Sequence, residues 1–224
     1  MAEFAIAVTP SPGGMAVDFE ERVNFPRLRD YRLARVRAAL DASPAGALLC
    51  FDTNNIRYTT STQIGEWARD KMTRYSLLAR EGDPMVWDFG SAAAHHRLYA
   101  PWLKPENCRA GLNGLRGAIP PDNELFKRTA KEIAMLLREQ GVADMPLGVD
   151  IVEPPMLFAL QEEGLDVIDA QQIMLDAREI KSPDEISQFF PKHPEVLENT
   201  LKIADEVNLE IPTQIHLPEF PLPE

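Results

Sequence analysis

Two adjacent histidines are the first candidates for chemistry in this sequence. His95 and His96 stand in "SAAAHHRLYAPWL", whose Ser cap and alanine run predict a helix up to Pro101. Imidazole can bind a metal ion or act as a base. Adjacent helical residues point about 100° apart, however, and no carboxylate follows at the spacing of a helical metal site. The sequence therefore favours an ordinary surface or capping pair over a metal ligand or a catalytic base.

The two cysteines are the next candidates. Cys50 lies within the apolar run "AGALLCF", and Cys108 stands alone in "ENCRAG". Neither has the spacing of a zinc site or of a disulfide framework. We expect two reduced thiols without a metal or redox role.

Composition limits the partners that the protein could bind. The formal net charge is −12, from 23 basic and 35 acidic residues, which argues against a nucleic-acid surface. The glycines of "GLNGLRGA" lack the strand-then-helix context of a dinucleotide site and predict a loop. Near the start, the apolar run "AIAV" is too short for a signal peptide or a membrane span. We expect a cytoplasmic protein that binds neither nucleic acid nor membrane.

The elements that must position these residues alternate along the chain. Periodicity and capping residues predict helices over 26–43, 91–100, 120–141, 153–164 and 170–180. Apolar, β-branched or aromatic runs predict strands over 45–51, 56–61, 74–80, 85–89, 146–150 and 165–170. The strands at 74–80 and 85–89 should pair antiparallel through "EGDP". Such alternation predicts a layered α/β domain with helices on both faces of a sheet.

Composition also divides the chain into three parts. Residues 1–26 are aperiodic and contain "TPSPGG", so we expect an arm. Residues 27–181 hold the α/β pattern. Residues 182–224 form a linker, an amphipathic helix and a proline-rich tail: from Lys181 onward there are three lysines against nine acidic residues, and seven of the 19 prolines. In "PEVLENTLKIADEV" one apolar side includes Ile203 and Val207, and such a stripe needs a partner surface.

Three stretches resemble one family: "DTNNIRYTTST", "RYSLLAREGDPMVWDFGSAA" and "LGVDIVEPPMLFALQEEGLDVIDAQQIMLDAREIKSPDEI". Over about residues 27–187 they are similar to the N-terminal domain of creatinase/prolidase-type proteins. That family includes Xaa-Pro aminopeptidases and dipeptidases, creatinase, and a dimethylsulfoniopropionate lyase. The resemblance implies a three-layer α/β domain, with a mixed sheet flanked by helices.

The resemblance also implies where the chemistry belongs. In that family a C-terminal domain holds two divalent metal ions with two Asp, one His and two Glu, and the metals activate a water. After Ile186 this sequence has only His193 and His216, in no recognisable ligand pattern. The resemblance thus implies a non-catalytic domain, with no catalytic residue, metal site or cofactor of its own.

Two residues match a region that helps to form the active site in relatives. There the N-terminal domain of one subunit leans over the site of the other, and an aromatic or arginine residue after "NIRY" helps to close the pocket. Trp67 and Arg74, in "IGEWARDKMTRY", match this substrate-pocket region. An indole offers an apolar wall and a guanidinium a carboxylate partner. A packed tryptophan and a surface arginine are the alternative. We expect a homodimer or a partner catalytic domain.

The end of the chain resembles a different protein. "FFPKHPEVLENTLKIADEVNLEIPTQIHLPEFPLPE" is similar, over about residues 189–224, to a segment of the alpha subunit of bacterial DNA polymerase III. "LENTL", "IAD" and "HLPEFPLPE" carry the match. Val207 stands where that family often has Cys, and the polymerase's catalytic motifs are missing. A protein-interaction module, or an inert fusion or fragment carrying this tail, is therefore the alternative to a domain that supports a metallohydrolase.

Overall fold

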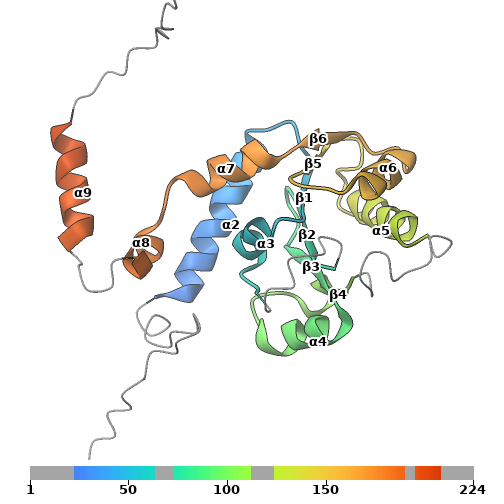
Figure 1. Cartoon of the computed structure of the whole chain (residues 1–224), viewed down its shortest axis with the longest axis horizontal. Coiled ribbons are helices and arrows are strands. Elements are labelled where there is room, and N and C mark those ends of the chain that lie inside the picture. The colour runs from blue at the N-terminus through green and yellow to red at the C-terminus, as the bar shows by residue number, and fades with distance from the viewer. Residues whose placement is uncertain (1–22, 64–72, 112–123, 190–194, 208–224) are drawn as a thin grey trace, which may run out of the picture. The chain divides into compact units, whose positions relative to one another are not determined.

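The computed structural model describes residues 23–63, 73–111, 124–189 and 195–207 (Figure 1). They fall into two compact units, one of residues 24–182 and one that contains the described residues from 183 onward. The first unit is an α/β domain. The second contains two helices, α8 (Pro183–Phe189) and α9 (Glu195–Glu206). Every helix within the described ranges is too short or too polar to span a bilayer.

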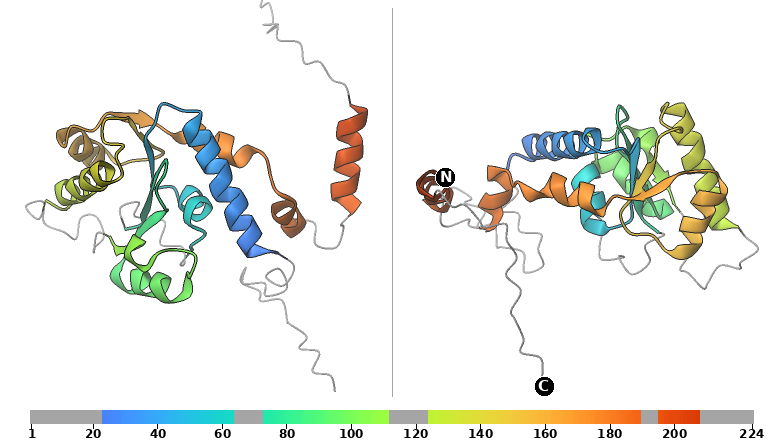
Figure 2. Two further views of the ribbon diagram at one scale, coloured as in Figure 1. Left: turned by 180° about the vertical axis from the view of Figure 1, so that it is seen from behind. Right: turned by 90° about the horizontal axis from the view of Figure 1, so that it is seen from above.

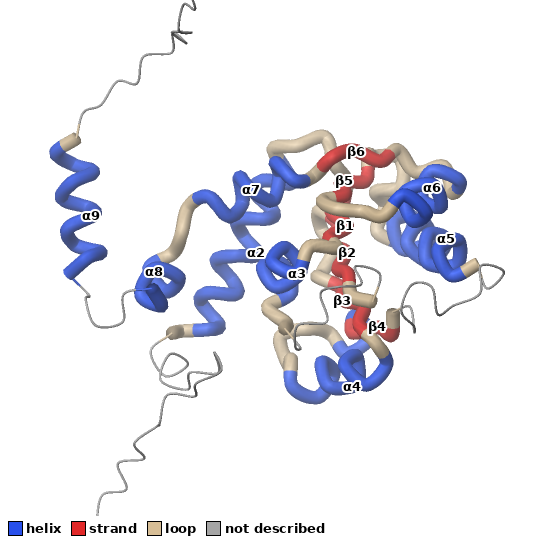
Figure 3. Tube along the Cα trace, in the orientation of Figure 1, coloured by secondary structure: helices blue, strands red, loops and turns tan. Residues whose placement is uncertain are grey.

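A six-stranded mixed sheet forms the centre of the α/β unit (Figure 3). The order across the sheet is β4 (Cys108–Ala110), β3 (Met85–Asp88), β2 (Tyr75–Ala79), β1 (Ala47–Cys50), β5 (Leu147–Val149) and β6 (Val167–Asp169). Strands β1, β5 and β6 run parallel, β2 is antiparallel to both of its neighbours, and β4 is parallel to β3. The predicted antiparallel pairing of β2 with β3 is confirmed.

Helices cover both faces of this sheet, as the sequence predicted (Figure 2). The helices of the described part of this unit are α2 (Phe25–Asp41), α3 (Thr53–Thr60), α4 (Gly90–Tyr99), α5 (Leu125–Glu139), α6 (Pro154–Glu162) and α7 (Gln171–Glu179). Helices α5 and α6 pack on one face, α2, α3 and α7 pack on the other, and α4 lies beside β3 and β4. A short 3-10 turn, Pro105–Asn107, precedes β4.

Strict alternation along the strands produces two cores. In β1, Leu49 faces the core under α5 and α6, whereas Leu48 faces the core under α2 and α7. Both side chains are fully buried. A strand that is apolar on both sides is typical of a sheet covered on two faces, which is why "AGALLCF" predicted this arrangement. Gly141 follows the C-cap of α5 at φ +71° and so stops the helix, as expected. Residues other than glycine rarely adopt this backbone angle.

Helix α2 is held in place by its arginines. It contains five arginines and two aspartates. Arg35 donates to the main-chain carbonyls of Asp176 and Ala177 near the end of α7, at 2.7 and 3.2 Å. Arg37 donates to two carbonyls of the β2–β3 turn at 2.6 and 2.7 Å. These side chains therefore connect α2 to a helix and a hairpin that are distant in sequence.

The strand predicted over 56–61 is wrong, since these residues belong to helix α3 and its C-cap. The side chain of Asp52 accepts hydrogen bonds from the Asn54 and Asn55 N–H groups and so caps the helix. The β-branched and aromatic residues that suggested a strand, such as Ile56, are buried against the sheet. Tertiary packing and the cap outweigh local β-propensity here.

Two smaller predictions also need correction. The N-cap of α4 is Phe89, which makes no side-chain capping hydrogen bond, and Ser91 lies inside the helix. Strand β4 was not predicted, because its three residues carry no periodic signal. Asp122, predicted to cap α5, and "GLNGLRGA" lie largely outside the described residues.

In the second unit, α9 is the predicted amphipathic helix. Ile203 is 60% exposed, and Val207, directly after the helix, is 55% exposed. Both belong to the stripe that the sequence expected to need a partner surface.

Candidate functional site

The sequence-predicted residue Arg74 lies in a buried polar cluster. It directly precedes β2, whose register pairs Tyr75 with Trp87, so that Arg74 stands opposite Asp88. Its Nε lies 3.2 Å from Oδ2 of Asp88, and the two side chains are only 11% and 3% exposed. The contact is an ion pair without an aligned Nε hydrogen bond. Nη2 of Arg74 donates to the carbonyl and the hydroxyl of Thr62, at 2.6 and 2.7 Å.

Asp88 also binds one of the two histidines. Nε2 of His96 lies 3.0 Å from the same Oδ2, and the other carboxylate oxygen accepts a hydrogen bond from the Phe89 N–H. His96 is 3% exposed, so the expectation of a surface or capping pair is wrong for this residue. His95 is exposed, and its ring lies 4.5 Å from that of Tyr99. The helical rotation of about 100° between neighbours separates the two environments.

The cluster holds the chain rather than presenting a reactive group. Burial lowers the pKa of Arg74, and the carboxylate of Asp88 acts in the opposite direction and favours the cation. The side chains of Arg74, Asp88 and His96 are largely shielded from solvent, with exposures of 11%, 3% and 3%. In place of the surface arginine considered as an alternative, the structure shows a largely shielded arginine that joins the start of β2 to the end of α3.

The exit of α3 lies between this cluster and a second feature, the indole of Trp102. Trp102 donates its Nε1–H to the carbonyl of Thr60 at 2.9 Å. The hydroxyls of Thr60 and Thr62 are 2.7 Å apart, and Thr62 in turn binds Arg74. Between them, Ser61 adopts φ 53° and ψ 29°, a left-handed conformation that is uncommon for a non-glycine residue. Trp102 and Arg74 therefore fix the same three residues from two sides.

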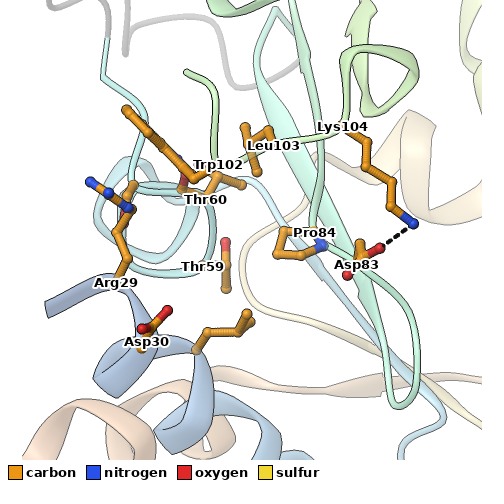
Figure 4. Close-up of a pocket in the computed structure, with 11 residues that line it drawn as sticks. Arg29, Asp30, Thr59, Thr60, Asp83, Pro84, Trp102, Leu103 and Lys104 are labelled. Carbon is orange, nitrogen blue, oxygen red and sulfur yellow. Dashed lines mark hydrogen bonds and ion pairs between the residues drawn. The ribbon is translucent and has the colours of Figure 1, made fainter. Parts of the chain in front are cut away.

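Trp102 also forms one wall of a pocket (Figure 4). The cavity of about 190 Å³ is lined by α2, the end of α3, the β2–β3 turn and the chain that follows α4. The guanidinium of Arg29 lies over the Trp102 ring, 4.3 Å from its centroid, and the indole is 40% exposed. On the other side, Lys104 pairs with Asp83 at 2.6 Å, and this contact raises the pKa of Lys104.

A second polar network lies at the carboxyl ends of the parallel strands β1 and β5, where α/β sheets commonly bind ligands. The two oxygens of Asp150 accept hydrogen bonds from three backbone N–H groups and from the amide of Asn55, at 2.6–3.1 Å. Asn55 then accepts from Arg178 at 3.0 Å. Both carboxylate oxygens have partners within the domain, so Asp150 connects β5 to the start of α3 and neither oxygen is left free for a ligand.

Several features that the sequence predicted are not part of the two polar networks or the pocket. Trp67 lies outside the described residues. Both cysteines are free, as predicted, and burial raises the pKa of each thiol. Among the residues that the structure describes, no group of three or more His, Cys, Asp or Glu could hold a metal ion. The sequence reasoning missed Asp88, Trp102 and Arg29. The hairpin register could have revealed Asp88, since it follows from the predicted "EGDP" turn.

Comparison with known proteins defines the class of this fold. No protein-family model matches the chain. The structure resembles an Xaa-Pro dipeptidase from Bacillus anthracis, with a TM-score of 0.51 and 14% identity over 80% of this chain and 44% of that chain. The N-terminal domain of the cytoplasmic peptidase PepQ from Mycobacterium tuberculosis is less similar, with a TM-score of 0.45. The α/β unit therefore has the creatinase N-terminal-like fold that the sequence predicted.

In sequence, the chain is similar to two lyases. It is 30% identical to the dimethylsulfoniopropionate lyase DddP of Roseobacter denitrificans over 189 residues, which cover 81% of this chain and 41% of the lyase. It is 28% identical to the DddP of Roseovarius nubinhibens over 165 residues, or 71% of this chain and 36% of the lyase. The chain thus matches less than half the length of either relative.

Proposed function

We propose that this chain provides the non-catalytic N-terminal domain of a creatinase/prolidase-type metalloenzyme, which supports a metal site held on another domain or subunit. One observation carries the proposal: most of this chain matches about two fifths of each DddP lyase. The fold shared with the Bacillus anthracis dipeptidase is consistent with this role.

In this proposal Arg74 is a positioning residue. Its guanidinium binds Asp88 and Thr62, so it is not available to a substrate carboxylate. It instead fixes the chain on both sides of residues 64–72, with Thr62 before them and β2 after them. An effect of Arg74 on a partner's active site would therefore act through the backbone that it holds.

The exposed face of α4 is the surface that we assign to a partner subunit. Leu98 is 75% exposed and Tyr99 is 66% exposed. Adjacent large apolar side chains on a surface commonly mark an interaction site. We propose that a second copy of the chain covers this face. Sedimentation velocity should show a dimer that Leu98→Glu dissociates, whereas Met135→Glu, at an exposed position of α5, should leave it intact.

Catalysis by the chain alone is the direct test of the main proposal. The purified chain would be loaded in turn with Mn²⁺, Zn²⁺ or Fe²⁺ and assayed against dimethylsulfoniopropionate and an Xaa-Pro dipeptide. We expect no metal-dependent cleavage of either. A chimera in which the chain replaces the matching part of the Roseobacter denitrificans lyase should cleave dimethylsulfoniopropionate. Metal-dependent turnover by the chain alone would contradict the proposal.

The exposed stripe of α9 supports a second candidate, a protein-interaction module. Ile203 and Val207 are more than half exposed in the described part of this unit. The resemblance of residues 189–224 to the polymerase segment remains a prediction. If the chain is such a module, a cellular partner captured by the full chain should be lost from an Ile203→Glu variant and retained by a Lys202→Gln variant.

A further inference from the structure

The pocket beside Trp102 has the chemistry of a ligand site. We propose that it binds a small zwitterion of amino-acid size, with the ligand carboxylate on Arg29 and its ammonium group on Asp83. This inference concerns a site on the described domain and does not depend on the function proposed above.

Arg29 is the first part of the argument. Stacking on Trp102 at 4.3 Å orients its guanidinium at the mouth of the pocket. Among the described residues, its N–H groups have no hydrogen-bond acceptor. A planar guanidinium that is held by stacking and keeps its donors unused is well suited to bind a carboxylate with two parallel hydrogen bonds. Its partly buried position would strengthen that contact relative to one in bulk water.

Asp83 provides the opposite charge across the cavity. Figure 4 shows Arg29 and Asp30 on one side, and Asp83 with Lys104 on the other. The Asp83–Lys104 pair is well exposed, with side-chain exposures of 49% and 61%, so Asp83 can accept a second cation at little cost. The lining holds two cationic and two anionic side chains. A zwitterion keeps this balance, whereas a simple anion or cation would disturb it.

The floor and the size of the pocket restrict the ligand further. Leu33, Pro84 and Leu103 provide apolar surface between the charged sides. The hydroxyl of Thr59 is already used by neighbouring main-chain carbonyls, so the floor offers little polar recognition. A volume of about 190 Å³ lies below the roughly 300 Å³ at which clefts for drug-sized ligands begin. A short aliphatic body between two charged ends fits these limits.

Backbone strain at the rim is an independent observation. Ser61 lines the pocket in a left-handed conformation, with φ 53°, and its hydroxyl has no partner among the described residues. Strained non-glycine residues cluster at ligand clamps, because the surrounding structure must hold them there. Trp102 supplies that restraint through its hydrogen bond to Thr60.

Ligand titration of the full chain tests the proposal. The readout is the indole N–H signal of Trp102 in a nitrogen-correlated NMR spectrum, assigned by its loss in Trp102→Phe. The probes are 5-aminopentanoate, pentylamine, which lacks the carboxylate, and pentanoate, which lacks the ammonium group. We expect a saturable shift with 5-aminopentanoate at millimolar concentrations, and about tenfold weaker binding of each analogue, because each loses one charge-assisted contact.

Matched variants separate this site from general charge effects. Arg29→Gln should weaken 5-aminopentanoate binding about tenfold, whereas Arg27→Gln, the same change on the same helix outside the pocket, should leave it unchanged. The buried indole of Trp87 reports whether each variant is folded. The proposal is overturned if 5-aminopentanoate causes no saturable shift, if either analogue binds equally well, or if folded Arg29→Gln binds like the wild type. The three-ligand series on the wild type decides between these outcomes even if that variant fails to fold.

Discussion

Two carboxylates at strand ends, Asp88 and Asp150, obtain their hydrogen-bonding and charged partners in different ways. Asp150 is surrounded mainly by main-chain N–H groups and one amide. Asp88 binds an arginine and a histidine, both brought from other elements. Main-chain donors are fixed once the strands pair, whereas long side chains must be ordered at an entropic cost. The Asp150 network therefore follows directly from the fold, whereas the Asp88 cluster depends on particular residues.

Removing the charge of Asp88 should have the largest effect on stability. Asp88→Asn leaves the guanidinium of Arg74 without a counter-ion in a site where it is 11% exposed. We expect a loss of about 3–5 kcal/mol in the free energy of unfolding, measured by urea denaturation. The double variant with Arg74→Gln should recover part of that loss. A loss below about 1 kcal/mol would show that the ion pair is not the source of the cost.

The matching change at Asp150 should cost less. Asp150→Asn keeps one acceptor oxygen but presents a donor to the Asp52 N–H and to Asn55. We expect a loss of about 2 kcal/mol, because no buried cation is left uncompensated. Amide hydrogen exchange at Asp52 should also accelerate. Equal losses for the Asp88 and Asp150 variants would remove the contrast between the two carboxylates.

Alkaline pH sharpens the comparison through Cys50, which lies beside Asp150. Burial, and then the charge of Asp150, raise the pKa of its thiol well above the usual 9.0. Above pH 9.0 the unfolded state loses a proton that the folded state keeps. The free energy of unfolding is therefore unaffected by this thiol below pH 9.0 and falls as the pH rises above it. The slope should reach about 1.4 kcal/mol per pH unit. Urea midpoints at about pH 8 and about pH 10 measure it.

Cys50→Ala supplies the control for this pH dependence. The variant should lose stability less steeply above pH 9.0, although Cys108 and the buried Tyr75, whose pKa values are also raised by burial, should keep part of the slope. A slope unchanged from the wild type would contradict the assignment to Cys50.

The smallest effect is expected where both partners are exposed. Lys127 and Glu162 lie 3.3 Å apart with side chains 58% and 60% exposed. Solvent screens such a pair, so Lys127→Gln should change the free energy of unfolding by less than about 0.5 kcal/mol. A loss comparable to that of Asp88→Asn would show that burial does not decide the value of these ion pairs.

The sequence predicted the parts of the fold that depend on local pattern. The β2–β3 hairpin and the helices α2, α6 and α7 follow from turn residues, prolines and apolar spacing. Helix α3 did not, because its β-branched residues favour a strand until Asp52 caps it and the sheet buries it. Local preference is reliable only where packing agrees with it.

The contacts of the candidate site also fall into two kinds: those that follow from local pattern and those that depend on packing. Arg74 and Asp88 are opposite each other in a predictable hairpin, so their pairing could have been inferred from the sequence. Arg29 and Trp102 are 73 positions apart and meet only because α2 crosses the end of α3. No spacing or motif signals a contact that depends on how two layers pack. The role proposed for Trp67 remains a prediction from the family resemblance.

The arginines of α2 have a consequence for how this protein tolerates substitution. Arg35 and Arg37 bind main-chain carbonyls of a helix end and a turn, not side chains. Any residue that preserves the path of the chain at those positions offers the same oxygen. The receiving segments can therefore change their side chains freely while the two arginines remain required. Covariation between positions in related sequences would therefore not reveal these contacts.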